Sequence, residues 1–188
     1  MRASFEQLEA LAVRALAQAA GDVAELGVWR GDTFAPLARL AGEGRRTAYA
    51  VDSFAGMAAP GPLDTEEDGT CHYPQGALRV DAAAVQARLT GLGPHVRIVT
   101  GYVPDVLFTM PPAVRLAFVH LDLDHYEPTL AALKWLWIHM APGGILCCHD
   151  WFPGRRCLAA AAIAEWHERH PGLTGHATDT RHIWFEAA

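Results

Sequence analysis

Carboxylates and imidazoles follow directly after two apolar runs of the sequence. The side chains concerned are Asp122, Asp124 and His125 after the first run, and His149 and Asp150 after the second. If the two runs are neighbouring strands of a parallel sheet, both groups face one crevice outside the carboxyl ends of the strands. A carboxylate at the end of an apolar strand costs free energy unless it is paired or binds a cation. The pattern therefore indicates a metal site or, as the alternative, a set of capped and hydrogen-bonded turns.

The candidate metal ligands are Asp122, His149 and Asp150. Their carboxylate oxygens suit magnesium, and the imidazole nitrogen favours manganese or another transition metal. In the alternative interpretation the aspartates cap turns, and His149 is a buried imidazole with satisfied hydrogen bonds. An iron-binding set of His120, Asp122 and His149 is disfavoured, because such sets usually lie on an all-β double sheet.

A glycine-punctuated turn lies near the start of the chain, with the sequence Glu25-Leu26-Gly27-Val28-Trp29-Arg30-Gly31. Glycine lets the backbone turn tightly and approach a ligand closely. Asp52 ends the next predicted strand, 21 residues beyond Gly31, where a carboxylate can accept hydrogen bonds from both hydroxyls of a ribose. The two features predict a cofactor site, with Thr33 at the following helix start as a further binding residue. The alternative is a strand-to-helix turn that merely needs glycine, followed by an ordinary turn aspartate.

Strands that alternate with helices must position these groups. Apolar runs predict strands at 23–28, 48–51, 96–100, 116–121, 145–148 and 183–186. Helices are predicted from a capping box at Ser4 and Gln7, and over 33–41, 81–92, 128–139 and 155–169, with a turn at 142–144. This alternation predicts one α/β domain over 1–188, with a Rossmann-like, doubly wound, mainly parallel sheet and a C-terminal antiparallel strand pairing with 173–177. Residues 57–80 show no periodicity and are expected to form a mobile lid.

Composition narrows the functional classes. The chain has 188 residues and a net charge of -6, so no basic surface for nucleic acid is expected. The sequence contains no evident signal peptide and no apolar run that spans a bilayer, and its four cysteines lack C-x-x-C spacing. We therefore expect a cytoplasmic protein without a membrane partner. The apolar face of the first helix leads us to expect a homodimer.

Several runs of residues resemble the macrocin and mycinamicin O-methyltransferase family. They are the glycine turn at 25–31, Val51-Asp52-Ser53-Phe54-Ala55-Gly56-Met57, Leu121-Asp122-Leu123-Asp124-His125-Tyr126-Glu127-Pro128-Thr129, and Pro142-Gly143-Gly144 leading to His149-Asp150-Trp151. The resemblance covers about residues 22 to 165. It implies a class I methyltransferase fold, S-adenosylmethionine as cofactor, often magnesium, and methylation of a hydroxyl on a sugar or another natural-product scaffold.

The resemblance also assigns residues to roles. It implies that the cofactor is bound by Glu25, Gly27, Gly31, Asp52 and Ser53, and the metal by Asp122, His149 and Asp150. Tyr102 falls where an aromatic residue often lies near the cofactor. The family usually has two consecutive acids where this chain has His149-Asp150, which leaves the identity of the metal open. Catechol O-methyltransferases, which are more distant, have a lysine at the position of His125.

The expected reaction is attack of a substrate oxygen on the methyl carbon of the sulfonium. The general base is expected to be His125, because imidazole titrates near working pH, with Asp124 as the second candidate. Two other functions are kept as alternatives. One is a non-catalytic protein that binds S-adenosylmethionine, and the other is a nicotinamide-dependent oxidoreductase, which the missing third glycine of the dinucleotide fingerprint disfavours.

Overall fold

The computed structural model describes residues 2–66, 68–178 and 181–188. Its strands form one sheet in the order β3-β2-β1-β4-β5-β7-β6. Their bounds are β1 (Asp22–Leu26), β2 (Ala48–Asp52), β3 (Val96–Thr100), β4 (Leu116–Leu121), β5 (Met140–Cys148), β6 (His176–Ala177) and β7 (Ile183–Glu186). Strands β1 to β5 pair in parallel, and β7 runs antiparallel to both β5 and β6. The predicted doubly wound α/β sheet and its antiparallel C-terminal strand are confirmed.

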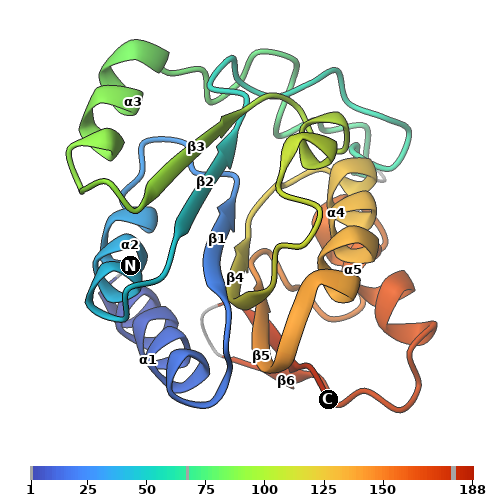
Figure 1. The fold of residues 1–188 in the computed structure, drawn as a ribbon. Helices are drawn as coiled ribbons and strands as arrows, with labels where there is room; N and C mark the ends of the chain where they lie inside the picture. Colours follow the sequence, from blue (N-terminus) through green and yellow to red (C-terminus); the bar gives the residue numbers. More distant parts are fainter. Residues whose placement is uncertain (1, 67, 179–180) are drawn as a thin grey trace.

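Helices cover both faces of this sheet (Figure 1). They are α1 (Arg2–Gln18), α2 (Phe34–Glu43), α3 (Ala82–Thr90), the 3-10 helix η1 (Asp105–Thr109), α4 (Tyr126–His139) and α5 (Leu158–Glu168). Helices α1 to α3 lie on one face, and α4 and α5 on the other. All six residues of β4 are buried, as expected for a central strand with helices on both sides.

Some predicted boundaries were wrong for identifiable physical reasons. The turn predicted at 142–144 lies inside β5, where the pairing with β4 shifts register and the N–H of Gly143 donates to the carbonyl of Ala187. The glycines therefore form an irregularity in a continuous strand. Helix α5 begins at Leu158 rather than at 155, and α1 begins before Ser4, which excludes a capping box there. Asp81, where a helix start is predicted, caps α3, since its carboxylate accepts from the N–H of Ala84.

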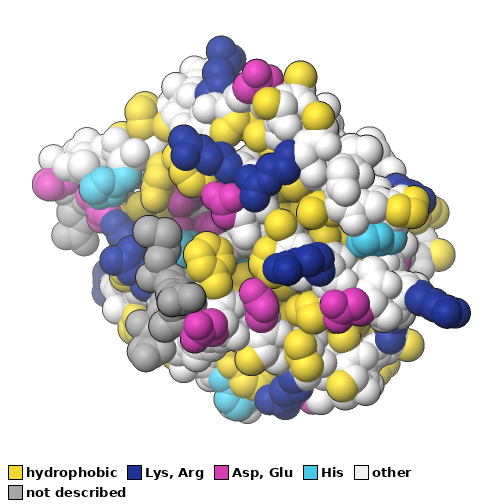
Figure 2. Space-filling model, turned by 90° about the vertical axis from the view of Figure 1, so that its left-hand side faces the viewer, with side chains coloured by type: hydrophobic (Ala, Val, Ile, Leu, Met, Phe, Trp, Pro, Cys, Tyr) yellow, Lys and Arg dark blue, Asp and Glu magenta, His cyan; other side chains and the backbone are white. Residues whose placement is uncertain are grey.

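The apolar face of α1 is covered within the chain itself. Its residues Leu8, Ala12 and Ala15 are buried in the core layer that they share with α2. The reason for expecting a homodimer was therefore wrong, and dimerisation stays an untested prediction. Figure 2 shows basic and acidic side chains interspersed over the described part of the face that carries α1 to α3. Within the described residues, no helix is long and apolar enough to cross a membrane.

Glu25 and His120 form a fully buried pair across β1 and β4. They are register partners in the sheet, and His120 Nδ1 lies 2.8 Å from Glu25 Oε1. Among the described residues, the second polar atom of each side chain, Glu25 Oε2 or His120 Nε2, has no hydrogen-bond partner. Burial raises the pKa of Glu25, although the hydrogen bond to His120 acts in the opposite direction. The two side chains thus depend on each other for solvation in the core.

Gly27 directly follows β1 and lies against Asp122, which directly follows β4. Its φ is +89°, and a Cβ there would come within 1.6 Å of the carbonyl oxygen of Asp122. Leu26 and Asp122 are held together by a hydrogen bond of 2.8 Å from the Asp122 N–H to the Leu26 carbonyl. Only glycine therefore allows the two strand ends to approach in this way.

We predict that Gly27→Ala lowers the free energy of unfolding by more than about 2 kcal/mol. A positive φ costs an alanine about 1–2 kcal/mol, and the Asp122 carbonyl must also move. The matched control is Gly69→Ala, because Gly69 has a φ of +85° with open space around its Cβ position. Urea denaturation of both variants is the measurement, and equal losses would contradict the role of the close approach.

We also predict that His120→Leu destabilises the fold by about 3 kcal/mol, because it leaves a buried carboxyl group without its partner. The control is the double variant Glu25→Leu with His120→Leu, which should recover much of this loss. Urea denaturation again measures the effect. A double variant that is less stable than His120→Leu would show that the pair does not act as a unit.

Candidate functional site

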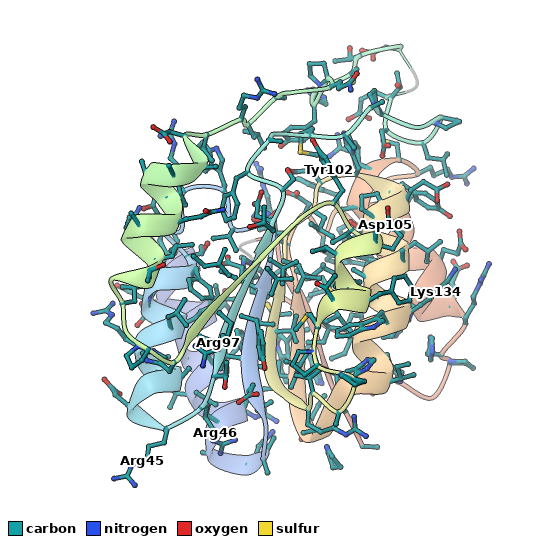
Figure 3. The ribbon with its side chains drawn as sticks, turned by 45° about the horizontal axis from the view of Figure 1, so that its top comes forward. Arg45, Arg46, Arg97, Tyr102, Asp105 and Lys134 are labelled. Atoms are coloured by element: carbon teal, nitrogen blue, oxygen red, sulfur yellow. The ribbon has the colours of Figure 1, made fainter. Side chains whose placement is uncertain are left out.

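A cavity of about 530 Å³ lies at the carboxyl ends of the parallel strands, where the strand order reverses between β1 and β4. Ligands bind at this place in doubly wound sheets. Its walls come from Gly27 and Trp29, from residues 51–53, 101–104 and 122–125, and from Gly56 and His149. Parts of the start of α4 and of the lid segment, which we define as 57–80, complete them. Figure 3 shows Tyr102 at this end of the sheet and the pair Arg45 and Arg46 at the opposite end. The arginine pair therefore lies away from the cavity.

Asp52 reaches the cavity with a carboxylate that the backbone holds in place. Its Oδ2 accepts from the N–H of Trp29 at 2.8 Å, and its Oδ1 accepts from the N–H of Phe54 at 2.7 Å. Each oxygen keeps a second lone pair, so the carboxylate can still accept hydrogen bonds from a ligand. Ser53 also lines the cavity, but its hydroxyl donates to the carbonyl of Gly56 and accepts from Ala55.

Four predicted cofactor residues, Gly27, Asp52, Ser53 and Tyr102, line the cavity. Tyr102 is 45% exposed there, and its ring offers a flat apolar surface. Trp29 lines the same region, and the sequence analysis missed it. Its φ is +49°, and the guanidinium of Arg30 lies 4.2 Å from its ring centre. An aromatic residue inside a glycine turn is the signal that could have indicated it.

Three predicted cofactor residues do not line the cavity, namely Glu25, Gly31 and Thr33. The geometry therefore does not favour their predicted direct contact with a cofactor. Glu25 is buried against His120, and the nearby side chain of Thr33 acts, after His120, to lower the pKa that burial raises. A Cβ on Gly31 would meet Leu89 of α3 at 2.6 Å. These residues therefore shape the turn and its packing, and the turn in turn presents Gly27 and Trp29 to the cavity.

Asp122, His149 and Asp150 meet as the sequence predicted. Each offers a ligand atom within 4.8 Å of the others. His149 Nδ1 lies 3.1 Å from Asp122 Oδ1 and 3.2 Å from Asp150 Oδ1. Burial lowers the pKa of His149, but hydrogen bonds to the two carboxylates outweigh it and raise the pKa to about 11. His120 is bonded to Glu25 instead, so the iron-binding set is not assembled.

Asp124 adds a third carboxylate to this cluster. Burial, then the negative charge of Asp122 and a hydrogen bond with Asp150, raise the pKa of Asp124 to about 8. Burial also raises the pKa of Asp150, but its contacts with His149 are stronger and lower it. Asp124 and Asp150 both have left-handed backbones, with φ of +59° and +58°. The concentrated negative charge and the oxygen and nitrogen donors fit a divalent cation.

His125 lies beside the cavity with a ring that is engaged on both sides. Its Nε2 lies 3.0 Å from the carbonyl oxygen of Tyr73, and its Nδ1 lies 3.8 Å from Asp64 Oδ2. A carbonyl only accepts, so Nε2 carries a proton in this arrangement. His125 can act as a base only when an acceptor hydroxyl replaces Tyr73 at Nε2, and its role stays a prediction.

The lid segment 57–80 contains no helix or strand in its described residues, in agreement with the sequence analysis. Hydrogen bonds join its two ends. The N–H of Met57 donates to the carbonyl of Ala77, and the N–H of Gly76 donates to the carbonyl of Met57. Its outer part contacts the start of α5, since the N–H of Leu158 donates to the carbonyl of Leu63 at 2.7 Å. The lid segment thus covers the cavity as a loop whose two ends are hydrogen-bonded to each other. Its mobility is not tested.

Glu66 adds a charged contact between the lid segment and the chain before α5. It pairs with Arg155 and accepts from Cys157 Sγ at 3.1 Å. Tyr73 of the lid segment lines the cavity, whereas Trp151 and Phe152 do not. Phe152 instead lies beneath the guanidinium of Arg155.

Similarity to known proteins agrees with this architecture. The family model described as Macrocin-O-methyltransferase (TylF) matches residues 2–179. The chain is 33% identical over 139 residues to 8-demethyl-8-(2,3-dimethoxy-alpha-L-rhamnosyl)-tetracenomycin-C 4'-O-methyltransferase of Streptomyces olivaceus, covering 70% of this chain and 53% of that relative. It is 32% identical over 162 residues to mycinamicin III 3''-O-methyltransferase of Micromonospora griseorubida, covering 80% of this chain and 61% of that relative. The chain thus spans a little over half the length of these relatives.

Solved structures show the same fold. The O-methyltransferase NovP has a TM-score of 0.80 at 23% identity, and the calicheamicin methyltransferase CalS11 has a TM-score of 0.81 at 19% identity. Each match covers 98% of this chain and 79% of the other. The sheet is therefore that of the class I methyltransferases, as the sequence predicted. With a family model that matches nearly its full length, the chain belongs to the macrocin O-methyltransferase (TylF) family.

Proposed function

We propose that this protein transfers the methyl group of S-adenosylmethionine to a hydroxyl of a small molecule, such as the sugar of a natural product. The observation that carries the proposal is a cavity whose walls include both Asp52 and, from the acid cluster, Asp122, Asp124 and His149. Family membership supports the reaction. The names of the relatives support a sugar acceptor, since they describe methylation at a 4' and a 3'' oxygen.

The cofactor would lie along the half of the cavity formed by β1, β2 and β3. In this arrangement Asp52 accepts hydrogen bonds from the ribose hydroxyls, and Tyr102 packs against the adenine. Gly27 lets the methionine part approach the backbone. Glu25 and Thr33 contribute by holding the turn, and Gly31 by its packing against α3. The reactive sulfonium carries the chemistry, so the protein acts mainly by alignment of two reactants.

A divalent cation, Mn²⁺ or Mg²⁺, would be held by Asp122, His149 and Asp150. When bound, it supplies a positive charge that orients the acceptor hydroxyl and lowers its pKa. The protein itself supplies a base for the proton, with His125 as the first candidate and Asp124 as the second. Asp124 lines the cavity and its carboxyl pKa of about 8 suits proton transfer near neutrality.

Two alternatives remain to be separated from this proposal. A non-catalytic protein would bind S-adenosylhomocysteine but form no methylated product. An oxidoreductase would bind NAD, which the family and the glycine pattern disfavour. Calorimetric titration with the two ligands, followed by a product assay with a glycosylated acceptor, distinguishes all three.

We predict that Asp122→Ala abolishes turnover and leaves the affinity for S-adenosylhomocysteine largely unchanged. Asp122 belongs to the acceptor side of the cavity, and its loss removes a metal ligand. The measurements are methyl transfer and calorimetric titration on the same preparation. A variant that methylates normally, with or without a chelator, would show that the metal-assisted mechanism is wrong.

We further predict that the wild type binds Mn²⁺ more tightly than Mg²⁺, because His149 supplies a nitrogen ligand. His149→Asp should reverse or narrow this preference, since three carboxylates suit Mg²⁺. Titration of both ions into both proteins gives the ratio of affinities. The control is His139→Asp, a histidine in α4 outside the cluster, which should leave the ratio unchanged. An unchanged ratio in His149→Asp would exclude His149 as a ligand.

A further inference from the structure

His182 is a buried histidine without a place in the proposed reaction. It directly precedes β7 and is only 5% exposed. It is not among the described residues that line the cavity, so it does not contact a cofactor or an acceptor there. The family model matches residues 2–179, and its match therefore ends before His182. A role for this residue has to follow from its own contacts.

The sheet places His182 beside the candidate metal ligand His149. Strands β5 and β7 are antiparallel, and Cys148 at the end of β5 lies opposite Ile183 at the start of β7. His149 comes directly after Cys148, and His182 comes directly before Ile183. Both histidines therefore leave the sheet at the same end, as neighbours on two adjacent strands.

Further hydrogen bonds hold the backbone of His182 beyond the last strand pair. The N–H of Trp151 donates to the carbonyl of Arg181 at 2.9 Å, which joins the two chain segments once more. The carbonyl of His182 accepts from the N–H of Thr178 at 2.8 Å, and its own N–H donates to Oγ1 of Thr178 at 3.2 Å. The ring of His182 thus projects from a fixed backbone.

This ring packs against the ring of His149. The two ring centres are 4.8 Å apart, and the ring of His120 lies 5.6 Å from His182 and 6.3 Å from His149. Nδ1 of His149 lies 3.1 Å from a carboxylate oxygen of Asp122 and 3.2 Å from one of Asp150. This nitrogen is the atom that could join both carboxylates on a cation. The orientation of the His149 ring therefore decides whether the three candidate ligands converge.

We propose that His182 is a positioning residue of the metal site, because its ring packs on His149 and keeps Nδ1 of His149 directed at Asp122 and Asp150. The proposal rests on the proposed function, in which these three residues hold a divalent cation. Partners that orient a metal ligand without touching the metal typically change metal affinity by about ten- to hundred-fold. His182 acts through the surface of its ring, so another flat ring can replace it.

The test is calorimetric titration of Mn²⁺ into variants of His182. His182→Ala removes the ring, and His182→Leu removes it but fills most of its space, which keeps the comparison possible if the alanine variant does not fold. We expect both to bind Mn²⁺ at least about ten-fold more weakly than the wild type, and His182→Phe to stay within about three-fold of it. Wild-type affinity in His182→Leu, or a loss in His182→Phe as large as that in His182→Leu, would overturn the proposal.

The control is His176→Ala, which removes another ring from the same strand pair. His176 lies in β6 and stacks on Trp184 of β7, with ring centres 4.1 Å apart. This variant should bind Mn²⁺ as the wild type does. The affinity for S-adenosylhomocysteine should change less than about two-fold in His182→Leu, because packing next to a metal ligand acts mainly on the metal. Equal losses of affinity for Mn²⁺ and for S-adenosylhomocysteine would indicate a merely structural role and contradict the proposal.

A double-mutant cycle shows whether His182 acts through His149. In His149→Asp the ring that His182 orients is absent. His182→Leu should therefore change the Mn²⁺ affinity of His149→Asp by less than about three-fold. If His182→Leu has the same effect in both backgrounds, the two residues act independently and the proposal is wrong.

Crystal structures of the metal-free wild type and of His182→Leu give a readout that needs no metal. We expect Nδ1 of His149 to contact both carboxylates in the wild type and to turn away from at least one of them in His182→Leu. Unchanged contacts in His182→Leu would refute the positioning role. A wild type that binds no Mn²⁺ would instead refute the metal site of the proposed function, so the two failures are distinguishable.

Discussion

The contact between Gly27 and Asp122 is the constraint on which the site depends. The two residues lie at the ends of β1 and β4, where the order of strands reverses, and the Gly27 position leaves no room for a Cβ beside the Asp122 carbonyl. Because the strand ends meet there, the glycine turn and the acid cluster border one cavity. Gly27 and Asp122, which are far apart in the sequence, thereby line the one cavity in which the proposed cofactor and acceptor would meet.

Charge compensation is the second requirement of this architecture. Asp122, Asp124 and Asp150 are close together at the edge of an apolar core, and His149 forms hydrogen bonds with two of them. Without a cation, the imidazolium of His149 offsets the negative charges of Asp122 and Asp150. A bound metal would take over this role and leave His149 as a neutral ligand. The same cluster can thus be stable in the free protein and suited to a cation.

The central strands and the acid cluster were predictable because burial on both faces leaves continuous apolar runs, as in 116–121. The first residues of β5, 140–144, were not predictable. Gly143 and Gly144 are typical of a turn, and only the pairing with β4 and β7 shows that they belong to a strand. Sequence likewise could not separate Glu25, which pairs with His120, from residues that line the cavity. Side-chain direction at a strand end depends on the neighbouring strand. The burial of Asp64 was not predictable, because the sequence of an acidic loop does not indicate which of its acids becomes buried.

The lid segment completes the site by covering the cavity and contacting both α4 and the start of α5. The central claim is that cofactor and metal occupy opposite sides of one cavity at the Gly27–Asp122 contact. A crystal structure with S-adenosylhomocysteine and Mn²⁺ tests it most directly, because anomalous scattering locates the metal. We expect ribose hydroxyls on Asp52 and a manganese peak between Asp122, His149 and Asp150. A nucleoside bound away from Asp52, or a manganese peak elsewhere, would contradict it.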